Sequence, residues 1–354
     1  MEIVIAQDTD TKRWNEYVSR HAHASPYHLF AWKQSIETAY HQHGYYLMAL
    51  DKQNQITGIL PCILIKPPLG HATLCSLPYC DRGEALADSP AIAEQLMLKA
   101  NELRQIHKAD RYEYRSTKLP ASALDDRHVT SKTKQKVRMI LALPETSEAL
   151  LAGFKAKLRS QIKKAEKNGL TFVIGNNESL LSAFYDVFAT NMRDLGSPTH
   201  SKQWFECISR FYAEHCIISI IKYNSITIGA GIILINGKTA TIPWASTLRK
   251  YNKLAPNMLL YWSLLQYATD NGCQQFDFGR SSIDEGTFRF KQQWGAEPVE
   301  LDWRTFPVSI NNEVKQDNLH QSSSLRKTAE NIWRKLPLPL TIQLGSKVRK
   351  YISL

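Results

Sequence analysis

The sequence lacks the features of a secreted or membrane-spanning protein. Its six cysteines include no CxxC pair, which favours reduced and mostly buried thiols in a cytoplasmic chain. The first residues show no basic segment followed by an apolar one, so we expect no signal peptide. The longest apolar run, Ile226–Ile235, is far shorter than the ~20 residues that a membrane helix needs. These absences predict a cytoplasmic protein.

Several catalytic motifs are missing as well. The sequence contains no GxSxG motif, no P-loop and no paired-carboxylate pattern, which argues against hydrolase and kinase chemistry. Histidines gather at positions 21, 23, 28, 41 and 43, but cysteine and acidic ligands at metal-site spacing do not accompany them. We therefore predict no metal site.

Positive charge is what the chain has in excess. Its 354 residues carry a formal net charge of +11, which indicates an anionic partner. Nucleic acid, a phosphorylated sugar, a nucleotide and a membrane surface all meet that description. The length fits one large or two medium domains, with enough residues to bury a core in either case.

The same order of elements recurs in the two halves of the chain. In the first half we expect strands over 45–50 and 56–65, a helix over 88–107 and a strand ending in Arg115-Ser116. In the second half we expect strands over 217–223, 226–235 and 238–245, a helix over 257–270 and a strand ending in Arg280-Ser281. Asn236-Gly237 is a strong hairpin signal because both turn residues accept a positive φ. The two Arg-Ser pairs lie about 165 positions apart, which predicts two similar α/β halves.

The stretch from Phe276 to Trp303 gathers polar residues between a strand and a helix. Its pattern predicts a short strand with Phe276 and Phe278 inward and Asp277 outward, then a polar turn, one helix and a returning strand. The polar residues expected to lie near one another there are Arg280, Ser281, Arg289 and Lys291. We expect the functional site at this stretch.

The last residues change in composition. Positions 307–354 are polar and serine-rich at first, and then basic residues alternate with apolar ones. Such a tail suits the interface of a membrane with anionic headgroups, which would place the protein peripherally on the inner membrane face. It could equally pack on the N-terminal half, and the two interpretations are compatible.

Five motifs occur in an order that resembles FemAB-type acyltransferases, the superfamily that adds amino acids to peptidoglycan precursors. They are SLPYCDRG at 76–83, KLRSQIKKAEKNGL at 157–170, NMRDLGSP at 191–198, PWAS at 243–246, and FDFGRS with GTFRFKQQWGAEP at 276–298. The resemblance covers most of residues 11–306. It is strongest to the subgroup encoded with exosortase/PEP-CTERM exopolysaccharide systems.

This resemblance implies a fold and a reaction. The expected fold is α/β (α+β), with tandem GNAT-like domains that each contain a central mixed sheet, at 1–143 and 144–306, followed by the tail at 307–354. The expected enzyme is an acyltransferase or aminoacyltransferase. In it, an amine or hydroxyl of a sugar- or peptide-linked cell-envelope, peptidoglycan or exopolysaccharide precursor attacks an activated acyl donor without a metal or a resident cofactor. The alternative is a non-catalytic, membrane-associated scaffold of exopolysaccharide assembly.

The resemblance also suggests catalytic residues. Lys291 matches the lysine of the family's Phe-Lys motif, which is thought to contact a tRNA phosphate or to stabilise developing charge. Arg280 could hold a phosphate or carboxylate with its forked donors, and Asp277 could orient Arg280 or accept a proton. An ion pair that only supports the strand end is the structural alternative for Asp277 and Arg280, and a solvated helix face is the alternative for Lys291.

Further residues are candidates for substrate binding. They are Arg193, Trp244, Tyr261, Ser281, Arg289 and Phe290. Arg193 could clamp a substrate or, as an alternative, satisfy carbonyls at a helix end. Trp244 and Tyr261 could line an acceptor pocket or belong to the core.

The identity of the activated donor stays open between aminoacyl-tRNA and acyl-CoA. Acetyl-CoA-using GNAT enzymes have a glycine-rich pyrophosphate loop before the helix that we expect from Asn257. This chain has RKYNKLA at 249–255 there, without a glycine, so acetyl-CoA is not supported. The long heptad arm through which some peptidoglycan-bridge members are thought to assist tRNA binding is also missing.

Overall fold

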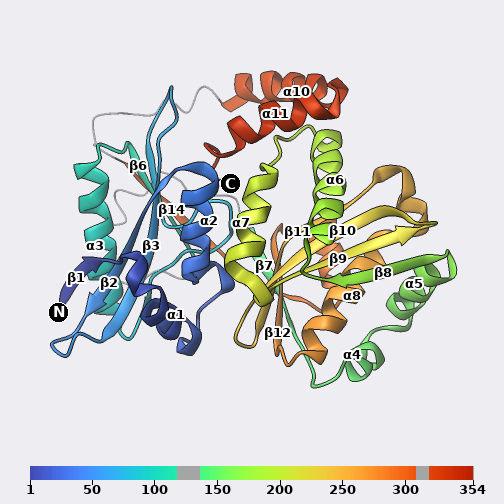
Figure 1. The fold of residues 1–354 in the computed structure, drawn as a ribbon, viewed down its shortest axis with the longest axis horizontal. Coiled ribbons are helices and arrows are strands. Elements are labelled where there is room, and N and C mark those ends of the chain that lie inside the picture. The colour runs from blue at the N-terminus through green and yellow to red at the C-terminus, as the bar shows by residue number, and fades with distance from the viewer. Residues whose placement is uncertain (118–135, 308–318, 354) are drawn as a thin grey trace.

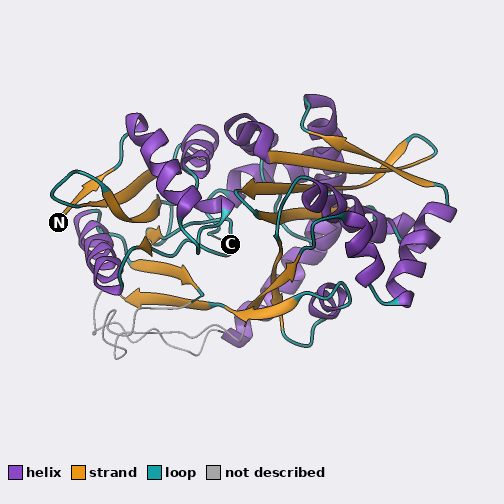
Figure 2. Cartoon of the chain, turned by 90° about the horizontal axis from the view of Figure 1, so that it is seen from below, coloured by secondary structure: helices purple, strands orange, loops and turns teal. Residues whose placement is uncertain are grey.

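The computed structural model describes residues 1–117, 136–307 and 319–353, which form two seven-stranded sheets with helices packed on them (Figure 1; Figure 2). The first sheet has the order β1–β2–β3–β4–β6–β14, with β5 beside β3. Its strands are β1 (Glu2–Ile5), β2 (His43–Leu50), β3 (Ile56–Ile65), β4 (Thr73–Cys75), β5 (Leu86–Ala87), β6 (Arg111–Ser116) and β14 (Asp302–Pro307). Its helices are α1 (Thr11–Arg20), α2 (Phe30–Tyr40) and α3 (Pro90–Ile106).

The second sheet has the order β13–β7–β12–β11–β10–β9–β8. Its strands are β7 (Lys136–Ala142), β8 (Leu170–Gly175), β9 (Cys216–Tyr223), β10 (Ile226–Asn236), β11 (Thr239–Thr247), β12 (Gln275–Ser282) and β13 (Glu297–Glu300). The helices of this half are α4 (Ser147–Gly153), α5 (Ala156–Lys167), α6 (Glu178–Leu195), α7 (Lys202–Tyr212), α8 (Pro256–Asp270) and α9 (Gly286–Gln292). Both sheets mix parallel and antiparallel pairs, which confirms the expected α/β class.

The period of two along β9 explains why helices cover both faces of the second sheet. Ile218 and Ile220 belong to the apolar core that includes α6, whereas Ile217 and Ile221 belong to the core that includes α8. Successive side chains of a strand point to opposite faces, so a continuously apolar strand needs a packed layer on each. Strand β9 therefore contributes side chains to both cores.

The internal repeat predicted from the sequence is present. In the first half β4 lies parallel to β6, and α3 occurs between them in the chain. In the second half β11 lies parallel to β12, with α8 in the corresponding place. The hairpin at Asn236-Gly237 also forms, with Asn236 paired to Thr239 and a positive φ at Gly237.

Each half lends one strand to the sheet of the other. β7 follows the first half in the chain but pairs with β12 and β13 of the second sheet, and β14 returns to pair with β6 of the first. The predicted boundaries at 143 and 306 therefore separate segments of the chain, but each sheet contains strands from both sides of a boundary. The alternating basic residues over 130–143 predict a strand with one solvated face, and positions 130–135 of it lie outside the described residues.

Aromatic side chains join the two halves. Helix α2 of the first half packs against α7 of the second. Between them the Trp32 ring meets the Trp204 ring edge-on, with 5.2 Å between ring centroids, and stacks at 6.2 Å on Trp244. All three are buried in one core that continues from β2 and β3 to β9 and β10. The two halves are thus joined by a continuous apolar core.

The tail forms α10 (Leu319–Lys335) and α11 (Leu338–Arg349), which lie against α6 at the top of the view in Figure 1. Gly345 allows a close approach, because a Cβ there would lie 2.8 Å from the backbone nitrogen of Thr199. Beyond α11, the carbonyl of Ser353 accepts hydrogen bonds from the Tyr79 amide (2.6 Å) and from Nη1 of Arg115 (3.0 Å). The tail therefore packs on both halves of the protein. In the described ranges no helix has the length and apolarity to cross a bilayer.

Candidate functional site

Lys291 is buried beside β12. Its Nζ donates hydrogen bonds to the carbonyls of Gly279 (3.1 Å) and Arg280 (2.8 Å), and the residue is only 8 % exposed. Gly279 has a φ of +71°, a conformation that glycine adopts without strain. It lies within β12 where the pairing with β7 shifts register, an irregularity that we call the β12 turn. Helix α9 thus brings the lysine of the FKxxWG motif onto the strand turn of the DFGRS motif.

Burial lowers the pKa of Lys291 to about 8, because the charged ammonium loses hydration, while the carboxylates of Asp81 and Asp277 oppose that shift. At neutral pH the group is still mostly protonated. An ammonium has three N–H donors, and the two carbonyls use two of them. One donor is left for an anionic or developing negative atom of a substrate.

The expectation that Asp277 faces outward is wrong, and the described contacts of its side chain are with Arg138 and Gly279. Asp277 is 3 % exposed, and its Oδ2 accepts hydrogen bonds from Nε (3.1 Å) and Nη2 (2.8 Å) of Arg138 on β7. Its Oδ1 accepts the amide hydrogen of Gly279 at 2.8 Å. The alternation of β12 breaks here, since the pairing with β7 shifts register between Asp277 and Arg280. Both carboxylate oxygens are engaged, so Asp277 shapes the turn that holds Lys291.

Arg280 meets the first half of the protein through Asp81. The Asp81 carboxylate accepts the backbone N–H of Arg280 at 2.9 Å and lies 3.7 Å from its Nε. Asp81 comes from the SLPYCDRG motif. In that motif Gly83 leaves no room for a side chain, since a Cβ would lie 2.7 Å from the Cβ of Leu77 and 2.8 Å from its backbone nitrogen. A motif from each half therefore contributes to one site.

Trp303 connects the two arginines of the internal repeat. The guanidinium carbons of Arg115 and Arg280 lie 4.9 and 4.8 Å from the centroid of its ring. Its indole Nε1 donates to the carbonyl of Asp81 at 3.0 Å. Arg115 is buried and donates to three carbonyls, those of Leu77, Cys80 and Ser353. Arg280 is the more open of the two, with its side chain 29 % exposed.

Tyr261 and Phe290 lie together beside the turn. The Tyr261 ring stacks on Phe278 at 5.6 Å and meets Phe290 edge-on at 4.9 Å between centroids. Burial raises the pKa of Tyr261 to about 12, which keeps its hydroxyl neutral. These aromatic rings form an apolar wall next to Lys291's helix.

The other predicted substrate-binding residues are placed differently. Trp244 is 7 % exposed and packs in the core between the halves, where Phe205 lies 5.0 Å from its ring centroid, so the core alternative describes it. Arg193 donates to the neighbouring Asp194 at 2.8 Å near the end of α6. Arg289 is exposed on α9. Ser281 is buried, and its hydroxyl lacks a hydrogen-bond partner in the described part of the chain.

Sequence reasoning assigned no role to Asp81, Arg138 or Trp303. Asp81 lies in the motif at 76–83 and Trp303 ends the stretch over 276–303. A linear pattern does not show that two motifs so far apart in the chain meet in space. Arg138 belongs to a strand expected to alternate between a solvated and an apolar face. In the structure this strand lies between β12 and β13 in the second sheet, and Arg138 is buried there.

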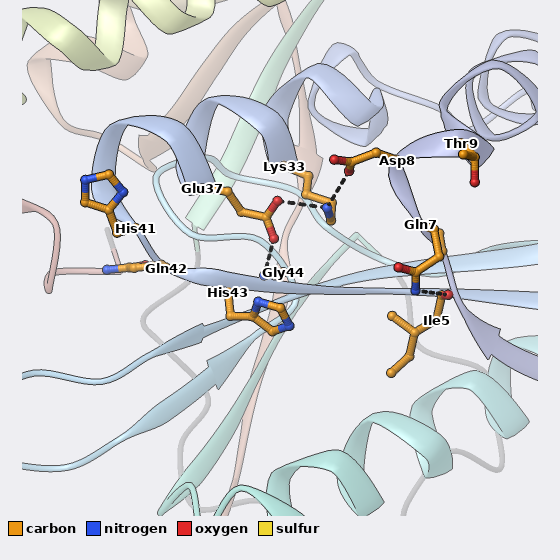
Figure 3. Close-up of a pocket in the computed structure, with 11 residues that line it drawn as sticks. Ile5, Gln7, Asp8, Thr9, Lys33, Glu37, His41, Gln42, His43 and Gly44 are labelled. Atoms are coloured by element: carbon orange, nitrogen blue, oxygen red, sulfur yellow. Dashed lines mark hydrogen bonds and ion pairs between the residues drawn. The ribbon is translucent and has the colours of Figure 1, made fainter.

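Two further pockets lie elsewhere in the described part of the chain. The first, of about 560 Å³, lies between the β1–α1 segment and α2 (Figure 3). In it Lys33 donates to Asp8 and Glu37, and Glu37 accepts the Gly44 amide, so these polar groups satisfy one another. The second, of about 450 Å³, lies between α1 and the β10–β11 turn. Neither contains a predicted site residue. In the described ranges no group of three or more His, Cys, Asp or Glu residues could hold a metal ion.

The segment before α8 forms a 3-10 helix over Arg249–Leu254. Ala255 then has a φ of +60°, and Pro256 occupies the first turn of α8. Proline has no backbone N–H, so this helix start offers one donor fewer to a pyrophosphate.

Comparison with known proteins assigns a class to the second half. Residues 152–292 match the model of the acetyltransferase (GNAT) domain family, a range that runs from the end of α4 to the end of α9 and includes Lys291. No curated protein matches the chain.

Solved structures extend this likeness to both halves. FemX covers 87 % of this chain and 98 % of its own, with a TM-score of 0.68 at 14 % identity. The C-terminal domain of a putative lysylphosphatidylglycerol synthetase from Agrobacterium fabrum covers 90 % and 96 %, with a TM-score of 0.58 at 11 % identity. A tandem GNAT protein from the clavulanic acid biosynthesis pathway covers 88 % and 99 %, with a TM-score of 0.54 at 13 % identity. The chain therefore has the expected tandem GNAT fold.

Proposed function

We propose that this protein is an acyltransferase that joins an activated acyl or aminoacyl group to a cell-envelope or exopolysaccharide precursor. The observation that carries the proposal is the Lys291 ammonium. It is buried in the GNAT-type half, and two carbonyls hold it beside Arg280 where the halves meet. The likeness to FemX and to a lysylphosphatidylglycerol synthetase domain supports an aminoacyl donor, and the family model supports acyl transfer in general.

In the proposed reaction a neutral amine, or a hydroxyl, of a sugar- or peptide-linked acceptor attacks the carbonyl carbon of the donor. A new C–N or C–O bond forms and the carbonyl oxygen becomes an oxyanion. Collapse of this intermediate breaks the bond to the ester oxygen or thioester sulfur. The attacking amine or hydroxyl loses its proton to solvent, and the departing oxygen or sulfur takes up a proton from solvent. The third N–H of Lys291 stabilises the oxyanion or a donor phosphate.

The neighbouring residues have supporting roles in this proposal. Arg280 binds an anionic group of donor or acceptor with the donors of its guanidinium that face away from Asp81. The Asp277–Arg138 pair and Gly279 fix the turn whose carbonyls hold Lys291. Tyr261 and Phe290 provide an apolar wall for the acyl group or the sugar. No resident cofactor is required, because the donor brings the activated bond.

A transfer assay with purified protein tests the proposal. Labelled aminoacyl-tRNA and labelled acyl-CoA are offered separately with lipid-linked or nucleotide-linked sugar and peptide acceptors. We expect transfer from one donor class, reduced about 10²–10³-fold by Lys291→Met, a loss typical of removing one oxyanion donor. Lys238→Met, which removes an exposed lysine from the β10–β11 turn, is the matched control. Transfer that survives Lys291→Met unchanged, or no transfer from either class, contradicts the proposal.

A further inference from the structure

Helix α11 exposes a row of apolar side chains. Leu340, Leu344 and Val348 recur every four residues and are 38, 40 and 49 % exposed. Residues four apart share one face of a helix. The neighbouring face carries Thr341 and Gly345, which are buried as α11 packs toward α6. The row itself is only partly covered by the protein.

Exposed cations occur on both tail helices. Lys347 is exposed on α11, and Lys327, Arg334 and Lys335 are exposed on α10, where Arg334 also donates to the Leu195 carbonyl. Glu330 is the single acidic residue in positions 327–353 of the sequence. On α10, Ile332 adds an apolar side chain that is 58 % exposed. Figure 1 shows α10 and α11 lying together along one edge of the molecule, beyond α6. We call the exposed basic and apolar side chains of these two helices the α10–α11 face.

We propose that the α10–α11 face docks on the interface of an anionic membrane. The apolar row of α11 would lie among the upper acyl chains, and the four exposed cations would lie among the lipid phosphates. A nucleic acid would attract the same cations, but it offers no apolar phase for the leucine and valine side chains. A protein partner of matching acidity would have to cover both helices. The combination of a regular apolar row with excess positive charge favours a bilayer, and this inference does not depend on the proposed reaction.

Vesicle sedimentation tests the inference without any donor or acceptor. The full chain is mixed with vesicles of phosphatidylcholine, with or without about one third phosphatidylglycerol. We expect binding to the anionic vesicles and little to the neutral ones. A Leu344→Ser, Val348→Ser double variant should bind at least about tenfold more weakly, because it removes two inserted side chains. Lys347→Gln should weaken binding about fivefold, the effect of one cation near the surface.

Matched substitutions elsewhere distinguish binding by the α10–α11 face from nonspecific binding by any exposed cation or apolar side chain. Leu69→Ser changes a leucine that is 91 % exposed in the β3–β4 connection, and Lys157→Gln removes an exposed cation from α5. Both should leave vesicle binding unchanged, and thermal unfolding should show that all variants fold. Equal binding of the Leu344, Val348 variant and the wild type overturns the inference. So does equal binding to neutral and anionic vesicles, or binding to tRNA alone.

Discussion

The carboxylate of Asp81, in the first half of the chain, accepts the backbone N–H of Arg280, in the second half, at 2.9 Å. The same carboxylate lies 3.7 Å from Nε of the Arg280 side chain, and the Asp81 carbonyl accepts from the Trp303 indole. Arg280 in turn provides one of the two carbonyls that hold Lys291. The position of Lys291 in the second half therefore depends on a loop of the first.

Asp81→Ala should lower the transfer rate while leaving most of the fold intact. The substitution removes the acceptor for the Arg280 amide and the negative charge beside its guanidinium. We expect a loss of about 1.5–3 kcal/mol in unfolding free energy, typical of a hydrogen bond to a charged group. Asp81→Asn keeps an oxygen for the amide, so urea unfolding should show a smaller loss. Equal stability of Asp81→Ala and wild type would mean that this contact does not hold the halves in register.

The pH dependence of transfer should report the charge state of Lys291. Its pKa is lowered to about 8 by burial, so the ammonium is present below that pH and is lost as the pH rises through it. If the ammonium stabilises negative charge, transfer at saturating substrate should stay level below pH 8 and fall above it. A rate that instead rises through pH 8 would identify the neutral amine as the active form. Lys291→Met should abolish this dependence on pH.

Much of the fold follows from short-range patterns. The hairpin at Asn236-Gly237 and helix α8 form where composition indicates them, because turn residues and helical periodicity act within a few positions. The repeat could also be predicted, since it rests on the order of such elements. The exchange of β7 and β14 between the sheets could not be predicted, because it depends on contacts between segments that are far apart in the sequence.

In the site too, the residues that are near one another in sequence could be predicted and their distant partners could not. Lys291, Arg280, Tyr261 and Phe290 lie within neighbouring elements of one half, and the structure brings them together around the β12 turn. Trp244 could not be separated from the core by its spacing, since a buried tryptophan and a ligand-binding one look alike in sequence. The buried partner of Asp277 comes from β7, 139 positions away, so no local pattern identifies it.

The buried Arg138–Asp277 pair should be sensitive to removal of one partner. Arg138→Met leaves a carboxylate in a site that is 3 % exposed, with the Gly279 amide as its remaining donor among the described contacts. We expect a loss of about 3–5 kcal/mol in unfolding free energy. The double variant Arg138→Met, Asp277→Asn should recover part of it, because no charge is then left unpaired. Urea unfolding of the double variant and of each single variant measures the coupling between the two residues. A double variant whose loss equals the sum of the two single losses would exclude such coupling.

Acid should destabilise the first half through His28. The side chain is fully buried. Its Nδ1 accepts from the Ser25 amide at 3.2 Å, and its Nε2 lies 3.1 Å from the Glu84 carbonyl. These contacts fit the neutral ring with a hydrogen on Nε2, and burial lowers the pKa to about 4 from an ordinary 6.5. The unfolded chain therefore binds a proton at a higher pH than the folded one does.

The consequence is a loss of stability that starts near pH 6.5 and levels off near pH 4, on the order of 3 kcal/mol for this one group. His200 is also buried with a lowered pKa and should add to the slope. His28→Asn removes one titrating group, so its unfolding free energy should fall less steeply between pH 6.5 and 4 than that of wild type. Parallel curves for the two proteins would show that His28 is not protonated on unfolding in this range. The comparison of slopes holds even where the substitution lowers stability at every pH.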